Sequence, residues 1–152
     1  MKLLFDTSVW VDHLRRAALD PVINAIRGRF LLCFDAVVAA ELVAGCRSKQ
    51  ERRIVGRLCA PHQRSGRLLC PLSSDFERAA VALSRLRARG RPPSGSKSAL
   101  LDALIAVVAA RQGALLVTKN LADFTRLAEE IPVLVEGFET FAQRLLEPSE
   151  VR

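Results

Sequence analysis

Short apolar segments alternate with longer helical patterns along almost the whole chain, and this alternation limits the possible folds more than any other feature of the sequence. Strand-like segments are expected at residues 2–5, 30–34, 67–70, 114–118 and 132–135. Helical patterns fill most of the intervals, at 8–15, 20–28, 36–45, 49–60, 74–89, 99–112, 121–129 and 138–146. Strands that alternate with helices usually pair in parallel and are covered by the helices. We therefore predict an α/β fold with a parallel, helix-covered sheet.

The length of 152 residues suits one domain with a substantial core. We expect this domain to span residues 1–146, with residues 147–152 as a C-terminal tail. No apolar run approaches the roughly 18 residues that a membrane span needs, and Asp6 interrupts the first apolar segment before the core of a signal peptide forms. We expect a cytoplasmic protein that does not bind membranes.

The four cysteines and two histidines do not have the spacing of a structural zinc site. There is no C-x-x-C pair, and the cysteines lie 11 or 13 residues apart by subtraction of their numbers, at Cys33, Cys46, Cys59 and Cys70. We expect four reduced thiols with apolar neighbours.

The formal net charge of +7 favours a polyanionic partner or an acidic protein partner. The positive charges form two regions, one of Arg47, Lys49, Arg52, Arg53, Arg57, Arg64 and Arg67 and one of Arg85, Arg87, Arg89, Arg91 and Lys97. Either region is equally well explained as a solvated helix face. The stretch 88–99 is expected to be a mobile basic loop with nothing to pack, because Pro92 and Pro93 end the preceding helix.

Three carboxylates occupy apolar surroundings, where a lone charge is costly to bury. Asp6 directly follows the first strand, Glu41 lies in a helix that is apolar on nearly every face, and Asp102 is the only charge between Lys97 and Arg111. Each has a structural explanation: Asp6 as a helix cap, Glu41 as the partner of an arginine, and Asp102 as a first-turn acid in a helix capped by Ser98.

The topology favours a shared site for these acids. Parallel α/β sheets bind ligands in the crevice at the carboxyl ends of their strands, where Asp6, Asn120 and Asp123 follow strands and where helices carrying Glu41 and Asp102 can begin. Carboxylates gathered in one crevice repel each other unless they bind protons or share a cation. Oxygen ligands suit Mg²⁺ or Mn²⁺, which lowers the pKa of a bound water for attack on phosphorus.

The segments LLFDTSVWVDHL, AAELVAG and LLDALIAVVAARQGALLVTKNLADF resemble, in order and spacing, the PIN-domain ribonucleases and in particular the VapC-type toxins of bacterial toxin–antitoxin pairs. The resemblance implies a three-layer α/β/α sandwich with a five-stranded parallel sheet. It also implies a metal-dependent endoribonuclease in which Asp6, Glu41 and Asp102 are catalytic and bind Mg²⁺ or Mn²⁺, and in which the hydroxyl of Ser8 supports Asp6.

The fourth position of the site departs from the pattern. Many PIN members have Asp two residues after a strand-end Thr, whereas here Thr118 is followed by Asn120 and the nearest acid is Asp123. By resemblance we predict Thr118 as a supporting residue, Asn120 as a metal ligand and Asp123 as a catalytic acid, with the number of metals left open.

The resemblance implies an RNA substrate such as tRNA or another structured RNA, a VapB-like antitoxin and a homodimer. The apolar run Val9, Trp10 and Val11, together with the many Ala, Leu and Val residues of the early helices, is expected to exceed what one small core needs and so to suit a protein interface. Trp10 itself is expected in the core. Two other readings stay open: a PIN-like binding or regulatory protein with little cleavage, and another phosphate-handling α/β domain such as a phosphoacceptor receiver or an aspartate-phosphatase fold.

Overall fold

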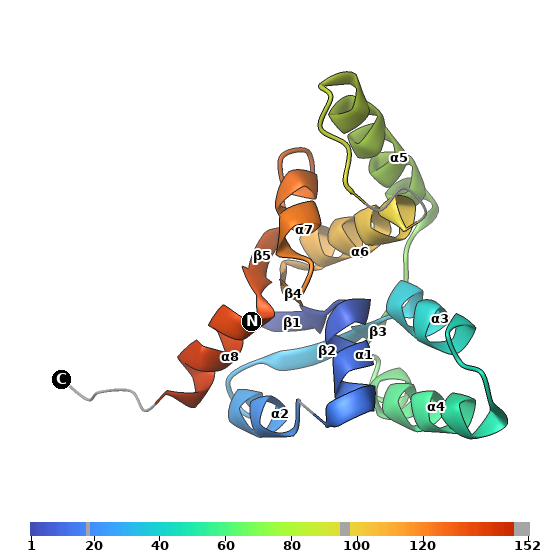
Figure 1. Cartoon of the computed structure of the whole chain (residues 1–152), viewed down its shortest axis with the longest axis vertical. Helices are drawn as coiled ribbons and strands as arrows, with labels where there is room; N and C mark the ends of the chain where they lie inside the picture. Colours follow the sequence, from blue (N-terminus) through green and yellow to red (C-terminus); the bar gives the residue numbers. More distant parts are fainter. Residues whose placement is uncertain (18, 95–97, 148–152) are drawn as a thin grey trace.

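A five-stranded parallel sheet lies at the centre of the molecule, with strand order β3-β2-β1-β4-β5. The computed structural model describes residues 1–17, 19–94 and 98–147. The strands are β1 (Lys2–Phe5), β2 (Leu31–Asp35), β3 (Leu68–Leu69), β4 (Ala114–Thr118) and β5 (Leu134–Gly137). Helices cover both faces of this sheet (Figure 1), so the predicted α/β class with a five-stranded parallel sheet is confirmed.

Each predicted helical pattern corresponds to a helix of the structure. The helices are α1 (Thr7–Arg16), α2 (Asp20–Ile26), α3 (Ala36–Ala44), α4 (Lys49–Arg64), α5 (Ser73–Ala88), α6 (Ala99–Gln112), α7 (Leu121–Leu127) and α8 (Phe138–Leu146). Helix α4 continues four residues beyond its predicted end at 60, through Pro61. Proline removes a single backbone donor, and the helix tolerates that loss near its C-terminus. Strand β5 begins two residues later than predicted, because Pro132 lacks an N–H for the sheet and pairing starts at Leu134.

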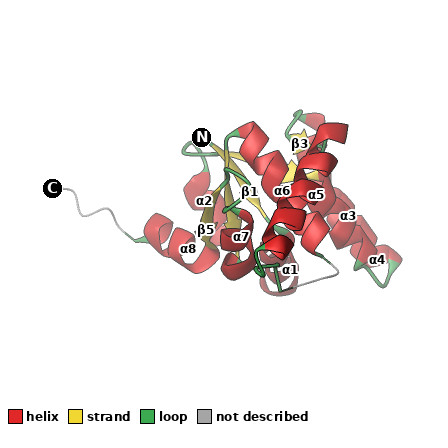
Figure 2. Cartoon of the chain, turned by 90° about the horizontal axis from the view of Figure 1, so that it is seen from above, coloured by secondary structure: helices red, strands yellow, loops and turns green. Residues whose placement is uncertain are grey.

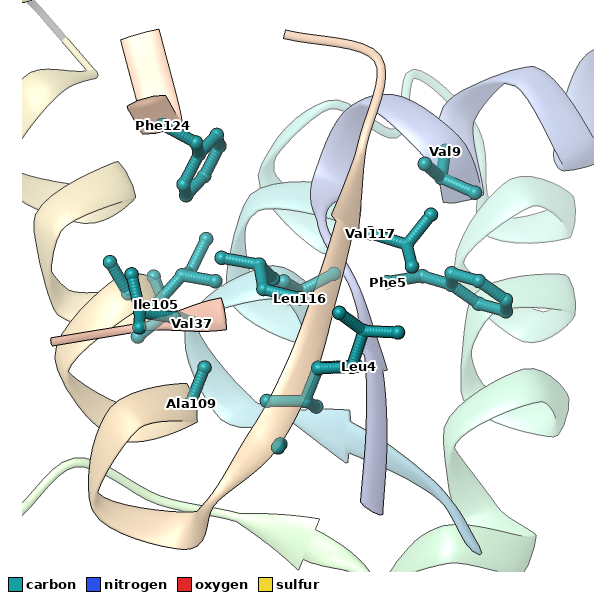
Figure 3. Packing of buried hydrophobic residues seen from close by; sticks show 14 of the residues in the cluster. Leu4, Phe5, Val9, Val37, Ile105, Ala109, Leu116, Val117 and Phe124 are labelled. Carbon is teal, nitrogen blue, oxygen red and sulfur yellow. The ribbon is translucent and has the colours of Figure 1, made fainter. Parts of the chain in front are cut away.

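The two faces of the sheet follow the alternation of side chains along β1 and β4. Leu4 is paired with Leu116 and Phe5 with Val117. Figure 3 shows Leu4 and Leu116 directed toward Ile105 of α6, and Phe5 and Val117 on the opposite side of the strands. Successive residues of a strand point to opposite faces, so one register fixes both layers of the core.

Helix α6 is apolar on nearly every side because it is enclosed on nearly every side. Its residues from Ala103 to Ala109 are buried, and the helix contacts both β4 and α5. Arg111 near its C-terminus reaches across to α5, where its guanidinium contacts the fully buried carboxylate of Asp75 at 3.0 Å. This ion pair joins the two helices on the α6 side of the sheet.

An aromatic cluster fills the other face. Trp10 of α1 lies edge-on to Phe5 and is tilted against Phe34, and Phe141 of α8 packs edge-on against Phe5. Trp10 is 1% exposed, so its predicted place in the core is confirmed. Figure 2, turned by 90° from Figure 1, shows the strands enclosed among the helices.

The chain reverses its direction of travel across the sheet between β1 and β4. From β1 it moves outward through β2 to β3, then returns to place β4 on the other side of β1. The carboxyl ends of β1 and β4 are therefore neighbours at a switch point, which is where open α/β sheets bind ligands. Helix α3 follows β2, on the side of β1 opposite β4. It contacts both α1 and α6 and therefore also lies near the switch point.

All four cysteines are free thiols. Across the described ranges, no helix is both long and apolar enough to cross a membrane. The predicted tail at 147–152 and the basic residue Lys97 fall outside the described residues, except for Glu147.

Candidate functional site

Asp6 stands at the carboxyl end of β1, and both of its carboxylate oxygens accept hydrogen bonds. Oδ1 accepts from the Ser8 hydroxyl at 2.7 Å and from the backbone N–H of Val9 at 3.3 Å, which caps α1. Oδ2 accepts from the Thr118 hydroxyl at 2.9 Å. Asp6 is only 4% exposed. The capping role expected from the sequence is thus present, and the same carboxylate lies at the switch point.

The loop after β4 holds the two hydroxyls that contact Asp6. The backbone N–H of Lys119 donates to the Ser8 hydroxyl oxygen at 3.0 Å, and that of Asn120 donates to the Thr118 hydroxyl oxygen at 2.8 Å. Each hydroxyl therefore accepts a hydrogen bond from a backbone N–H of the loop and donates one to the Asp6 carboxylate. The orientation of the Asp6 carboxylate depends on β1, α1 and the β4 loop together.

Glu41 reaches the site from α3, and its carboxylate is oriented by α1. The Thr7 hydroxyl donates a short hydrogen bond to Glu41 Oε2. Thr7 directly follows Asp6 in the chain, so the residue that orients Glu41 is the sequence neighbour of the other acid. Burial raises the pKa of Asp6, the hydrogen bonds from Ser8, Thr118 and Val9 oppose this rise, and the negative charge of Glu41 adds a smaller increase.

Asp102 lies in the first turn of α6, and the negative charges of three other acids affect its pKa. Burial and then the negative charges of Glu41, Asp6 and Asp123 raise its pKa to about 7. Ser98 occupies the N-cap position of α6, but its side chain does not accept a hydrogen bond from the helix as expected. Its hydroxyl instead donates to Asp102 Oδ2 at 3.4 Å. A charge acts on a pKa only over short distances, so Glu41, Asp6 and Asp123 lie in the same region as Asp102.

Asp123 and Asn120 lie at the start of α7 and contact each other. The Asn120 side-chain amide donates to Asp123 Oδ2 at 3.1 Å. Asp123 Oδ1 accepts from the backbone N–H and the hydroxyl of Ser94, at 2.8 and 3.0 Å, and contacts Arg126 at 3.3 Å. Burial would raise the pKa of Asp123, but these partners outweigh it and lower the pKa. The predicted metal and catalytic roles of Asn120 and Asp123 stay predictions.

The contacts of Ser94 correct one expectation from the sequence. The stretch 88–99 is not without packing partners, since Pro93 is buried and Ser94 is bonded to Asp123. The sequence offered no sign of this, because Ser94 and Asp123 are 29 positions apart and meet only through the fold.

Asp35 is an acid of this region that the sequence reasoning missed. It ends β2 and is 0% exposed; Oδ1 accepts from the Val37 N–H at 2.7 Å, whereas Oδ2 accepts no hydrogen bond from the described residues. Burial is the main reason that its pKa rises to about 7. A signal was present in the sequence: Phe-Asp stands at the carboxyl end of both strands, with Asp6 directly after β1 and Asp35 as the last residue of β2, and each Asp caps the next helix.

The site fits a divalent cation in charge and in donor type. Asp6, Glu41 and Asp102 offer only oxygen ligands. Burial, and to a smaller extent the charges of neighbouring acids, raises the pKa of Asp6 and Asp102, and a cation would favour their ionised forms. Among the described residues, however, no three acidic, histidine or cysteine side chains are already close enough to enclose a metal ion. Binding by all three acids would require them to move closer together.

A groove of about 490 Å³ adjoins Glu41, between α1, α3 and α4. Its apolar lining includes Val11, Leu14 and Ile54, and its charged lining consists of Arg15, Arg47, Glu41 and Glu51. Of the apolar run that was expected to exceed the core, Val9 and Trp10 are buried and only Val11 lines the groove. The groove on the α4 side of the site is therefore lined by apolar residues and by charges of both signs.

Comparison with known proteins gives one family and several related folds. The family model described as the PIN domain matches residues 3–130. No curated protein matches the sequence significantly.

Among solved structures, VapBC-1 from nontypeable Haemophilus influenzae has 18% identity and a TM-score of 0.70, over 91% of this chain and 99% of that chain. VapBC2 from Rickettsia felis, bound to a promoter DNA fragment, has 17% identity and a TM-score of 0.67, over 91% and 99%. VapBC-5 from Mycobacterium tuberculosis, a member of the VapBC family of toxin–antitoxin systems, has 24% identity and a TM-score of 0.54, over 90% and 96%. At these identities the similarity concerns the fold.

Proposed function

The chain belongs to the PIN-domain family, and on that basis we propose that it is a metal-dependent endoribonuclease, the toxin of a toxin–antitoxin pair. One observation carries the proposal: burial and the charges of Glu41, Asp6 and Asp123 raise the pKa of Asp102 to about 7. Acids from β1, α3, α6 and α7 thus share one electrostatic environment at the switch point of the sheet. Strongly perturbed carboxylates of this kind mark functional sites more often than structural ones.

Asp6, Glu41 and Asp102 are the residues that would hold Mg²⁺ or Mn²⁺. When bound, such an ion supplies a water of lowered pKa and a positive charge for the phosphate oxygens. The chain's own contribution is orientation: Ser8 and Thr118 donate to Asp6 and so favour its ionised form, and Thr7 directs Glu41. Asn120 offers a neutral amide oxygen beside the same site, which leaves the number of metals to measurement.

An RNA substrate, such as tRNA or another structured RNA, is supported by the charge of the chain. The net charge is +7, and the basic residues of α4 lie on its exposed face: Lys49, Arg52, Arg53, Arg57 and Arg64. Arg15 and Arg47 continue this positive surface to the groove beside Glu41. Contacts of this kind hold the phosphate backbone and do not read the base sequence.

A VapB-like antitoxin is the partner that we propose, together with a homodimer of this chain in the cytoplasm. Support for the antitoxin comes from the fold shared with VapBC structures and from the groove beside Glu41. Leu14 and Ile54 line this groove and are 38% and 41% exposed, so a partner segment would bury apolar surface there. A segment bound in the groove would lie next to the acids and block the substrate.

A second candidate function is a PIN-like binding or regulatory protein with little cleavage. Two observations favour it: Asn120 brings no charge to the fourth position, and the described acids do not already enclose a metal ion. The two candidates differ in one measurable property, turnover of RNA.

A cleavage assay tests the proposal. Purified protein is incubated with total tRNA and, separately, with single-stranded DNA, in Mg²⁺, in Mn²⁺ and in EDTA. We expect RNA fragments with either ion and none in EDTA, with activity restored by adding the ion back. Tight RNA binding without cleavage in any condition would instead support the second candidate.

A further inference from the structure

Asp123 is contacted by a loop from a distant part of the chain. The backbone N–H and the hydroxyl of Ser94 both donate to Asp123 Oδ1, at 2.8 and 3.0 Å. Asp123 is 4% exposed whereas Ser94 is exposed, so these two hydrogen bonds are partly buried. A carboxylate that accepts two hydrogen bonds from one residue fixes both the position and the orientation of that residue.

Further contacts tie the same segment to α7 and to the turn that follows it. Arg126 Nη1 donates to the Ser94 hydroxyl oxygen at 3.0 Å and to the Pro92 carbonyl at 3.4 Å. Arg91 pairs with Glu129 at 2.9 Å. The segment Arg91–Ser94 is therefore docked on α7 through its backbone as well as its side chains.

The loop also meets a second acid of the site. Ser98, four residues after Ser94, donates to Asp102 at 3.4 Å. Asp123 and Asp102 are close enough for the charge of one to affect the other. The described parts of this loop thus contact two neighbouring acids, Asp123 through Ser94 and Asp102 through Ser98.

The surroundings of Asp123 are poorly suited to holding a cation. Its Oδ1 already faces the guanidinium of Arg126 at 3.3 Å, and its Oδ2 accepts from the Asn120 amide at 3.1 Å. A positive charge this close repels a divalent ion and already balances the carboxylate. Among the described residues no basic side chain pairs with Asp6, Glu41 or Asp102, so Asp123 differs from them through its ion pair with Arg126.

We propose that Asp123 is a positioning residue that anchors the segment Arg91–Ser94 beside the carboxylate site, with Arg126 as the second anchor point. The anchored segment also carries Arg91, whose side chain is 59% exposed while it pairs with Glu129 and so can contact a substrate phosphate. This consequence for RNA rests on the proposed function, whereas the anchoring itself does not.

Hydrogen exchange at the Ser94 amide tests the anchoring directly. We compare the wild-type chain with Asp123→Ala, Ser94→Ala and Arg126→Gln by NMR. Ser84→Ala and Arg144→Gln are matched controls, since Ser84 is exposed on α5 and Arg144 pairs with Glu136 on α8. We expect the Ser94 amide to exchange about tenfold faster in Asp123→Ala, because the variant loses one hydrogen bond to a charged group. In both controls the Ser94 amide should exchange at the wild-type rate.

Kinetics and metal binding then test what the anchor does. Ser94→Ala and Arg126→Gln are expected to raise KM for RNA and to leave kcat and Mn²⁺ affinity unchanged, which is the signature of lost substrate binding alone. Unchanged exchange at Ser94 in Asp123→Ala overturns the proposal. So does a loss of Mn²⁺ binding in Asp123→Ala combined with a wild-type KM in the other two variants. If the wild-type protein cleaves no RNA, the proposed function fails, and the exchange rates still support or overturn the anchoring.

Discussion

Thr118 donates its hydroxyl hydrogen to Asp6 Oδ2 over 2.9 Å, which joins two residues 112 positions apart at the adjoining ends of β4 and β1. The contact exists only when the two strands are paired. The candidate site is therefore assembled by the sheet itself, and its chemistry depends on a hydrogen bond between strands.

Thr118→Val removes this hydrogen bond and keeps the shape of the side chain. We expect about tenfold slower RNA cleavage and a loss of about 1–3 kcal/mol of folding free energy, because the buried oxygen of Asp6 and the Asn120 N–H each lose a partner. Cleavage rates and urea unfolding measure the two effects. Thr125→Val is the control, since Thr125 is exposed on α7. Wild-type rates in Thr118→Val would show that the orientation of Asp6 does not depend on Thr118.

Asp6→Asn and Asp102→Asn each remove one negative charge without changing the size of the side chain. We expect each variant to lose RNA cleavage while keeping its circular dichroism spectrum and its folded state, because the acids act through charge and not through packing. Asp12→Asn is the control, since Asp12 pairs with Lys119 and Arg16 on the surface of α1. Full activity in either site variant would remove that acid from the mechanism.

Asp35 should make the metal-free protein less stable as the pH rises. Its pKa is about 7 in the folded protein against 3.8 for an ordinary Asp, so between these values the folded state holds a proton that the unfolded state has lost. Stability therefore falls as the pH rises from about 4 to about 7 and then levels off. Asp35→Asn removes this penalty and should stabilise the protein by up to about 4 kcal/mol at pH 8 and much less at pH 4.

Urea unfolding in EDTA at both pH values measures the difference. The Asn side chain can still accept from the Val37 N–H, so the cap of α3 is retained. An equal effect of the substitution at pH 4 and pH 8 would show that Asp35 titrates like an exposed acid.

Arg111→Met leaves the buried carboxylate of Asp75 without its partner. We expect a loss of about 3 kcal/mol in folding free energy, because an unpaired charge in the interior is costly. Arg144→Met is the control, since its pair with Glu136 is more exposed and should cost less than about 1 kcal/mol. Similar losses in the two variants would mean that Arg111 adds no more than a surface ion pair.

The sheet and the helices were predictable because hydrophobic period and chain order determine them. Asp6, Glu41 and Asp102 were identifiable because a charge in an apolar segment is conspicuous in any sequence. Thr7, Ser94 and Arg126 were not identifiable, since hydroxyl and basic residues are ordinary on a surface and their contacts exist only after folding. Asp35 lies between these cases: it follows Phe34 as Asp6 follows Phe5, but it ends its strand and is buried only once the sheet has formed.

A Mn²⁺ titration of the purified protein measures whether Asp6, Glu41 and Asp102 together hold a divalent cation. Calorimetry or electron paramagnetic resonance at pH 7.5 would follow binding to the wild-type chain, to Asp102→Asn and to the surface control Asp12→Asn. We predict saturable Mn²⁺ binding by the wild type and by Asp12→Asn, with most of the affinity lost in Asp102→Asn. Equal Mn²⁺ affinity in all three proteins, or no binding by the wild type, would contradict shared binding by the three acids.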